Sequence, residues 1–94
     1  MQAPMIHRNG TSREALLDQV CEAARAVWEA TLALERASPN QRDYYTFQGA
    51  AEAWQRARDE HGSRMRRLTS VVEELRNLAD AIANDDTDPP HTLT

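Results

Sequence analysis

Apolar residues recur at every third or fourth position along two long stretches of the chain. In the first stretch the recurring positions are Leu17, Val20, Ala24, Val27, Thr31 and Leu34, where the threonine is the one polar member. This spacing places all six side chains on one face of an α-helix and follows a heptad period. The pattern predicts a helix over about residues 12–37, with Leu16, Cys21 and Trp28 widening its apolar side.

The second stretch is longer and keeps the same spacing. Its inward positions are Ala50, Trp54, Ala57, His61, Met65, Leu68, Val72, Leu75, Ala79 and Ile82. Two spacings of four residues follow one another around His61, beside Gly62-Ser63, and such a pair can kink a helix or end it. We predict a helix that starts at Pro39 or only near Thr46 and ends near residue 84.

Two helix-start signals frame these stretches. Thr11 precedes Glu14 by three residues, which is the spacing of a capping box. Ser38, Pro39 and Gln41 suggest a second box, and the residue before a proline leaves the α region readily. We therefore predict a break in the helical pattern at Ser38.

These elements predict an all-α fold, with a helical hairpin favoured over a three-helix bundle. The hairpin is favoured because the apolar stripe continues through Gly62 and no polar connection interrupts it there. The expected layout is a flexible N-terminus at 1–10, a single helical domain at 11–84 and a disordered acidic tail at 85–94. A chain of 94 residues builds only a marginal core. We therefore expect the hairpin to dimerise into a four-helix bundle.

Composition narrows the classes of partner. The formal net charge of −4 argues against nucleic acid, which calls for a basic face. No apolar run is long enough for a membrane span, and the first ten residues lack the apolar region of a classical signal peptide. The one cysteine, Cys21, excludes an internal disulfide and is expected to be a buried thiol among apolar neighbours.

Chemistry-bearing constellations are sparse. His7, His61 and His91 are far apart, and the Glu-x-x-His pattern of helical di-iron sites is missing. Asn77 stands where helical pyrophosphohydrolases carry a further glutamate after a pair such as Glu73-Glu74. We therefore expect a non-enzymatic protein with no metal and no cofactor. A small-ligand site formed by Arg and His residues at a dimer interface remains the minor alternative.

Aromatic residues offer the best candidates for contact with a partner. Trp28 and Trp54 are expected to pack at similar heights in the hairpin, whereas aromatics at a turn are harder to bury and suit a binding patch. The predicted partner-binding residues are Tyr44, Tyr45, Phe47, Gly49, Trp54 and Trp28. Arg56, Arg64 and Arg67 are candidate contacts for an anion or an acidic partner, although a solvated helix face also explains them.

The sequence "FQG" at residues 47–49, the following "GAAEAW" and a chain of about a hundred residues with a break near residue 40 together resemble the WXG100 family of small helical hairpins. Phe47 replaces the family's tryptophan and Gly49 is kept. "RMRRLTSVVEELRNLADAIANDD" is similar to the family's second helix, so the resemblance covers about residues 14–86. It implies antiparallel pairing with a like or related hairpin and export by a type VII secretion system. The family's Tyr-x-x-x-Asp/Glu export signal is missing from "AIANDDTD".

The sequence thus predicts a protein that acts by association with itself or with a related helical protein, in a WXG100-like manner. The alternative is a small phage or bacterial regulator or inhibitor that docks on a larger protein complex through its aromatic turn and arginine cluster. A cytoplasmic location, or secretion without a classical signal peptide under the WXG100 resemblance, fits these readings.

Overall fold

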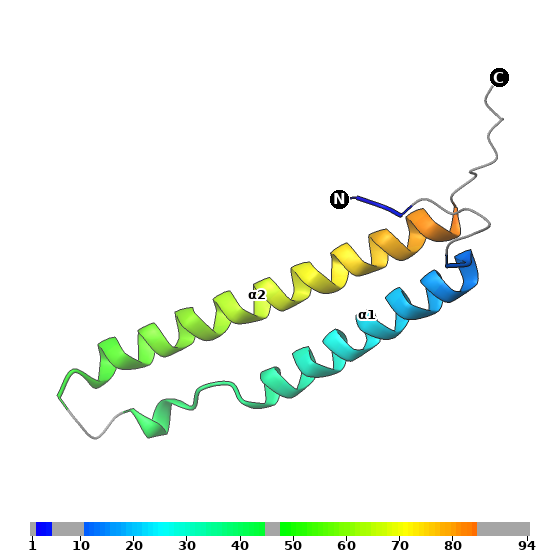
Figure 1. Cartoon of the computed structure of the whole chain (residues 1–94). Coiled ribbons are helices and arrows are strands. Elements are labelled where there is room, and N and C mark those ends of the chain that lie inside the picture. The colour runs from blue at the N-terminus through cyan, green and yellow to red at the C-terminus, as the bar shows by residue number, and fades with distance from the viewer. Residues whose placement is uncertain (1, 5–10, 45–47, 85–94) are drawn as a thin grey trace.

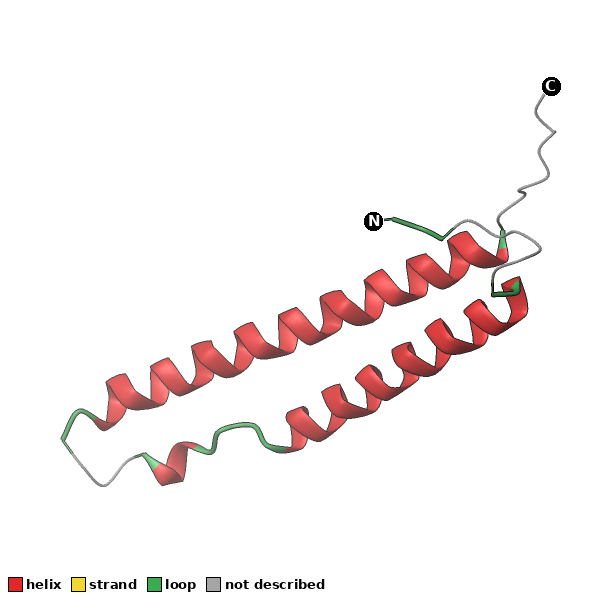
Figure 2. Ribbon diagram, viewed as in Figure 1, coloured by secondary structure: helices red, strands yellow, loops and turns green. Residues whose placement is uncertain are grey.

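The computed structural model describes residues 2–4, 11–44 and 48–84, and shows two antiparallel helices joined by an elbow (Figure 1). Helix α1 spans Arg13–Arg36, the short 3₁₀ helix η1 spans Gln41–Asp43, and α2 spans Ala50–Ala83. The described residues contain no strand (Figure 2). The predicted all-α hairpin is confirmed. The three-helix alternative is wrong, because α2 continues through Gly62 and Ser63 as one helix.

The start of α1 lies one residue later than its capping signal suggested. Ser12, not Thr11, is the N-cap residue, and its hydroxyl oxygen accepts a hydrogen bond from the Ala15 backbone N–H at 3.1 Å. This bond satisfies one of the backbone donors that a helix start leaves unpaired. The predicted box between Thr11 and Glu14 is therefore wrong in register, while the predicted helix is confirmed to within one residue at each end.

The elbow between the helices differs from the predicted second capping box. The Ser38 hydroxyl donates back to the Glu35 carbonyl oxygen at 2.6 Å, and Asn40 caps η1 by accepting a bond from the Arg42 N–H at 3.0 Å. Helix α2 then starts at Ala50, later than either predicted start, after Gly49 at φ +80°. Glycine adopts this left-handed conformation without the steric cost that a Cβ atom brings.

The two helices are unequal in length, and this sets the shape of the elbow. α1 has 24 residues and α2 has 34. Ser38, just past the end of α1, contacts His61 in α2. The part of α2 before His61 therefore extends about 17 Å beyond this contact, at a rise of 1.5 Å per residue. This part of α2 lies opposite η1 and its flanking loop (Figure 1).

The core follows the predicted stripes. Every predicted inward position of both helices is buried or half-buried. Among the described residues, the fully buried ones are Ala24, Thr31, Val72 and Ile82. The Thr31 hydroxyl donates to the Val27 carbonyl oxygen at 2.8 Å, so the buried polar group is satisfied.

This core is small for the length of the molecule, whose principal extents are 69 × 22 × 16 Å. Within the residues that the structure describes, three large apolar side chains remain substantially exposed: Trp28 at 40%, Leu32 at 42% and Val71 at 39%. In the described part of the chain, no helix is long and apolar enough to cross a membrane.

Candidate interaction surfaces

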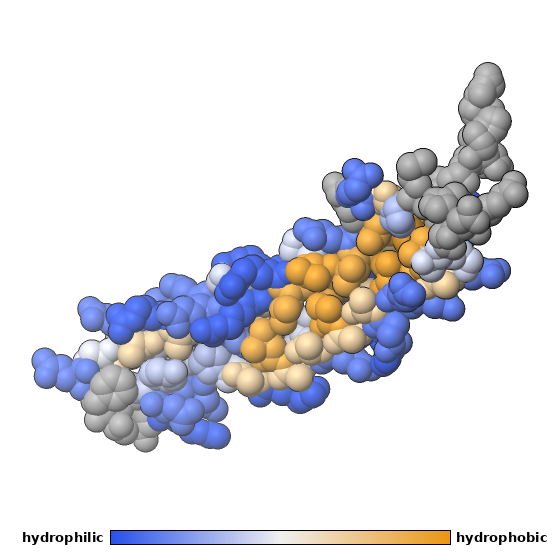
Figure 3. Space-filling view, viewed as in Figure 1, coloured by the Kyte–Doolittle hydropathy of each residue, from blue (hydrophilic) through white to orange (hydrophobic). Residues whose placement is uncertain are grey.

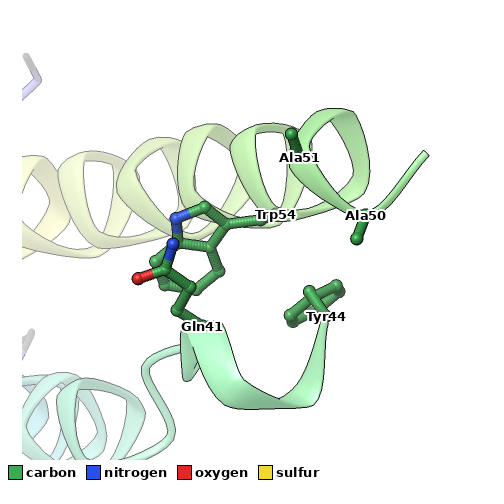
Figure 4. Close-up of a pocket in the computed structure, with 5 residues that line it drawn as sticks. All are labelled: Gln41, Tyr44, Ala50, Ala51 and Trp54. Atoms are coloured by element: carbon green, nitrogen blue, oxygen red, sulfur yellow. The ribbon is translucent and has the colours of Figure 1, made fainter. Parts of the chain in front are cut away.

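The elbow carries a hollow, here called the elbow pocket, of about 280 Å³. It is lined by Gln41, Tyr44, Ala50, Ala51 and Trp54 (Figure 4). Trp54 projects from α2 toward the η1 segment, and the centroids of the Tyr44 and Trp54 rings are 5.8 Å apart at an interplanar angle of 45°. Tilted pairs at this separation are favourable beyond the area they bury. The pocket therefore has two aromatic walls and methyl groups beside them.

Local sequence explains why these side chains meet. Because α2 extends past the end of α1, Trp54 has no part of α1 opposite it and packs on Tyr44 at the end of η1 instead. Tyr44 directly follows η1, whose start is fixed by the Asn40 cap. The left-handed turn at Gly49 starts α2 immediately before Ala50, on the far side of the pocket.

Arg58 lies on α2 beside the elbow pocket, and Arg66 lies about 18 Å from Trp54 along the same helix. The Arg58 guanidinium carbon lies 5.7 Å from the Trp54 ring centroid, within cation–π range. Gly62 follows Arg58 by four residues, and Arg66 follows it by eight. A guanidinium nitrogen of Arg66 lies over Gly62, 3.3 Å from the position that a Cβ atom would take there. The structure shows no salt bridge for Arg58 or Arg66 within the described residues.

A second hollow of about 300 Å³, here called the Trp28 groove, lies in the half of the hairpin away from the elbow. It is lined by Cys21, Ala24, Arg25, Trp28, Arg76 and Ala79. The Arg76 guanidinium carbon lies 5.6 Å from the Trp28 ring centroid. Trp54 and Arg76 are separated by about 33 Å along α2.

This separation corrects the prediction that Trp28 and Trp54 pack at similar heights. The antiparallel register pairs the middle of α1 with the C-terminal half of α2, so each tryptophan contacts its own arginine. The prediction of a buried Cys21 thiol is also wrong, because the free thiol is exposed. It lies at the edge of the apolar stripe, where a two-helix hairpin provides no third element to cover it.

Arg25 closes the outer side of the Trp28 groove and belongs to an exposed ion network. Its Nε donates to Glu22 at 3.2 Å, and a terminal nitrogen donates to Glu29 at 2.7 Å. The hydrogen bond from Arg25, and then its charge, hold the pKa of Glu22 below the ordinary value. The same bond, with the charges of both glutamates, raises the pKa of Arg25.

A third hollow of about 250 Å³ opens on the opposite side of the helix pair. Leu34, Arg64, Arg67 and Leu68 line it. Arg64 approaches Glu60 at 3.9 Å, and the Arg67 Nε donates to the Ser63 carbonyl oxygen at 3.3 Å. Of the three predicted basic contacts, the structure brings Arg64 and Arg67 together. Arg56 is exposed and lies outside this group.

The helix flanks that meet at this third hollow continue as an apolar surface, here called the Leu–Val face. Heptad spacing places Leu34 on one flank of α1 with Leu16, Val20, Ala23, Val27 and Ala30. The same spacing places Arg64 and Arg67 on one flank of α2 with Val71, Glu74, Leu75 and Leu78. Figure 3 shows a continuous apolar patch that spans both helices and gives way to hydrophilic side chains toward the elbow.

The Leu–Val face is large enough to matter for association. Its α1 row runs about 27 Å from Leu16 to Leu34, and two helices side by side are about 20 Å wide. The projected area is therefore on the order of 500 Å², including the charged Arg64, Arg67 and Glu74, which is the size of the largest and often functional apolar patch of a typical monomer. Most of its leucines and valines are half-buried by the hairpin alone, and Val71 is exposed.

Ser38 and His61 form the one side-chain hydrogen bond that links the two sides of the hairpin among the described residues, at 3.0 Å between Oγ and Nε2. Because a hydroxyl has one proton and Ser38 gives it to Glu35, Ser38 accepts at this contact and His61 donates. An Nε2 that carries a proton is not a base for Ser38. The pair therefore fastens the elbow and does not form an activated nucleophile.

Of the predicted aromatic-turn residues, some lie within the described part of the chain and others do not. Tyr44, Gly49 and Trp54 meet at the elbow, whereas Tyr45 and Phe47 lie outside the described residues. Within the described part of the chain, no group of three or more His, Cys, Asp or Glu side chains could hold a metal ion.

Sequence reasoning missed Gln41 and Ala51 as walls of the elbow pocket and Arg58 and Arg76 as partners of the two tryptophans. The sequence contained a signal for the Arg58 contact, since Arg58 follows Trp54 by four residues on the same helix. The Arg76 contact crosses between helices, so it required the register of the hairpin.

Comparisons with protein-family models, with curated proteins and with solved structures find no match for this chain.

Proposed function

We propose that this chain is a non-enzymatic association protein whose hairpin pairs with a second hairpin, either a copy or a related helical protein, to form a four-helix bundle. The observation that carries the proposal is the Leu–Val face. It extends over both helices of a hairpin whose described residues include only four fully buried ones. A second hairpin on this face would bury the apolar side chains of both helices, which two helices alone leave partly exposed.

The distribution of charge supports an antiparallel pairing. Residues 35–68, the elbow half, carry seven arginines and five carboxylates. Residues 13–34 and 69–83, the open half, carry three arginines and seven carboxylates. An antiparallel pair places the basic elbow half of one hairpin against the acidic open half of the other, and complementary fields favour that orientation.

Arg67 and Glu74 make this orientation specific. Both are exposed and lie seven residues apart on the Leu–Val flank of α2. In an antiparallel pair whose two-fold axis passes between these two positions, Arg67 of each hairpin approaches Glu74 of the other. The resemblance to WXG100 hairpins, with Gly49 at the start of α2, supports the same arrangement and, under this proposal, a role in type VII secretion.

Two matched substitutions test the proposal. Val71 and Leu32 are both aliphatic and about equally exposed, at 39% and 42%. Val71 lies on the Leu–Val face, whereas Leu32 follows Trp28 by four residues and flanks the Trp28 groove. We expect Val71→Glu to give monomers at micromolar concentration in analytical ultracentrifugation with helicity unchanged, while Leu32→Glu keeps the wild-type mass.

The outcome that contradicts the proposal is equally defined. A Leu32→Glu monomer beside an intact Val71→Glu dimer removes the Leu–Val face as the interface, and a wild-type monomer removes a second copy as the partner. The orientation has its own test: Arg67→Glu weakens the dimer and adding Glu74→Arg restores it. A double variant weaker than the single one contradicts the antiparallel pairing.

The second candidate function is a regulator or inhibitor that docks on a larger complex. The elbow pocket supports it, because this pocket lies at the elbow end of the α2 stripe and outside the Leu–Val face.

A further inference from the structure

The elbow pocket has the dimensions of a receptor for one side chain. Its volume of about 280 Å³ lies just below the range of pockets that hold whole small molecules. The walls include the Tyr44 and Trp54 rings, which contact each other, and Ala50 and Ala51 line the hollow from α2 (Figure 4). Aromatic rings around a hollow of this size are typical of pockets that receive an apolar anchor residue at a protein interface.

The arginines along α2 favour a partner segment that carries negative charge. Arg58 lies over Trp54, and Arg66 follows it by two turns on α2 with its guanidinium folded over Gly62. Neither has a salt bridge within the described residues, in contrast to Arg25, which pairs with two glutamates. Guanidinium groups without a carboxylate partner present several N–H donors in a geometry that fits carboxylates.

We propose that the elbow pocket docks an acidic segment of another protein, which places one apolar side chain in the hollow beside the Tyr44 and Trp54 rings and carboxylates on Arg58 and Arg66. The guanidinium groups of Arg58 and Arg66, which have no salt bridge within the described residues, support this occupant by charge complementarity. The inference is independent of the proposed bundle, because the pocket residues lie outside the Leu–Val face.

A labelled synthetic peptide provides the probe: a run of glutamates around one central leucine, measured by fluorescence anisotropy against the full-length protein. Two control peptides separate the contributions. In one, glycine replaces the leucine, and in the other, lysines replace the glutamates. We expect the glycine peptide to bind about tenfold more weakly and the lysine peptide not to bind, with affinity falling as salt screens the exposed charges.

The matched variants are Arg58→Gln and Arg76→Gln. Each removes an arginine that lies over a tryptophan at nearly the same distance, 5.7 Å for Arg58 and 5.6 Å for Arg76. Only Arg58 adjoins the elbow pocket. Arg58→Gln is expected to weaken binding about fivefold and Arg76→Gln to leave it unchanged, in keeping with the value of charge-assisted hydrogen bonds.

Ala51→Leu tests the cavity itself. Ala51 is an exposed helical position, so leucine keeps the helix while its side chain fills the hollow. Loss of leucine-peptide binding with unchanged helicity supports the proposal. Unchanged binding by Ala51→Leu, equal binding of the leucine and glycine peptides, or equal effects of Arg58→Gln and Arg76→Gln each overturn it, because binding is then diffuse charge attraction.

One further variant tests the acidic sequence of a second copy as the competing occupant. Asp85→Asn, Asp86→Asn and Asp88→Asn together neutralise the acidic C-terminal sequence in the full-length protein. If the triple variant binds the peptide at least tenfold more tightly than the wild type, the C-terminal sequence of a second copy competes for the pocket and the proposal of a foreign segment is wrong. Unchanged affinity supports the proposal.

Discussion

The open half and the elbow half of the hairpin carry the same apolar spacing but differ in how their side chains pack. All four fully buried residues of the described chain, Ala24, Thr31, Val72 and Ile82, lie in the open half. The elbow half has half-buried residues on its stripe but no fully buried one among those described. Instead it has the Ser38–His61 hydrogen bond and the Tyr44–Trp54 ring contact.

The difference arises from what faces α2. In the open half each turn of α2 packs on a turn of α1, whereas the first turns of α2 face η1 and a loop (Figure 1). Loop backbone supplies fewer apolar side chains than a helix stripe. Most of the folding free energy is therefore expected to come from the open half, while the elbow half keeps aromatic and cationic groups accessible to a partner.

The largest expected effect is loss of packing in the open half. Val72 is 1% exposed, and Val72→Ala removes two buried methyl groups and leaves a cavity. We expect the free energy of unfolding to fall by about 2 kcal/mol. The comparison variant Met65→Ala, at a half-buried position of the elbow half, should cost less than about 1 kcal/mol. Urea denaturation followed by circular dichroism measures both, and equal costs would erase the contrast between the halves.

Substitution by alanine is expected to have opposite effects on stability at Gly49 and Gly62. Gly49→Ala places a Cβ atom at φ +80° and should cost about 1 kcal/mol. Gly62→Ala should stabilise by up to about 1 kcal/mol, since Gly62 is inside a helix and the new Cβ meets only the flexible end of Arg66. Thermal unfolding measures both. Destabilisation by Gly62→Ala would show that the open space beside Arg66 is required for stability.

A smaller and local effect is expected at the ring contact. Tyr44→Ala removes the stacking on Trp54, worth about 0.5–1 kcal/mol. Tyr44→Phe, which keeps the ring, is the control. Hydrogen exchange should accelerate at the backbone amides of η1 in Tyr44→Ala, with little change in α1 and the C-terminal part of α2. Faster exchange along the whole hairpin would mean that the elbow stabilises the open half as well.

The smallest effect concerns the exposed network around Arg25. Because the folded-state pKa of Glu22 is lowered, its contribution to stability is present above the ordinary value of 4.5 and is lost as pH falls through the folded pKa. The wild type should therefore lose slightly more thermal stability than Glu22→Gln between neutral pH and acid. Identical pH profiles would show that this surface pair contributes nothing measurable.

The helices and their inward faces could be predicted from the sequence, because heptad spacing is a local property of the amino-acid sequence. The elbow could not, because the choice between Ser38 and Asn40 as a cap and the late start of α2 at Ala50 depend on how the loop closes. The separate locations of Trp28 and Trp54 depended on the antiparallel register, which no local signal encodes. The exposed Cys21 followed from the absence of a third helix over the groove.

The central claim is that the Leu–Val face is covered by a second hairpin, and the molar mass of the purified wild-type chain tests it most directly. Light scattering across micromolar concentrations should give about twice 10.6 kDa, with dissociation only on dilution. A constant mass of 10.6 kDa together with full helicity and cooperative unfolding would contradict self-association through this face.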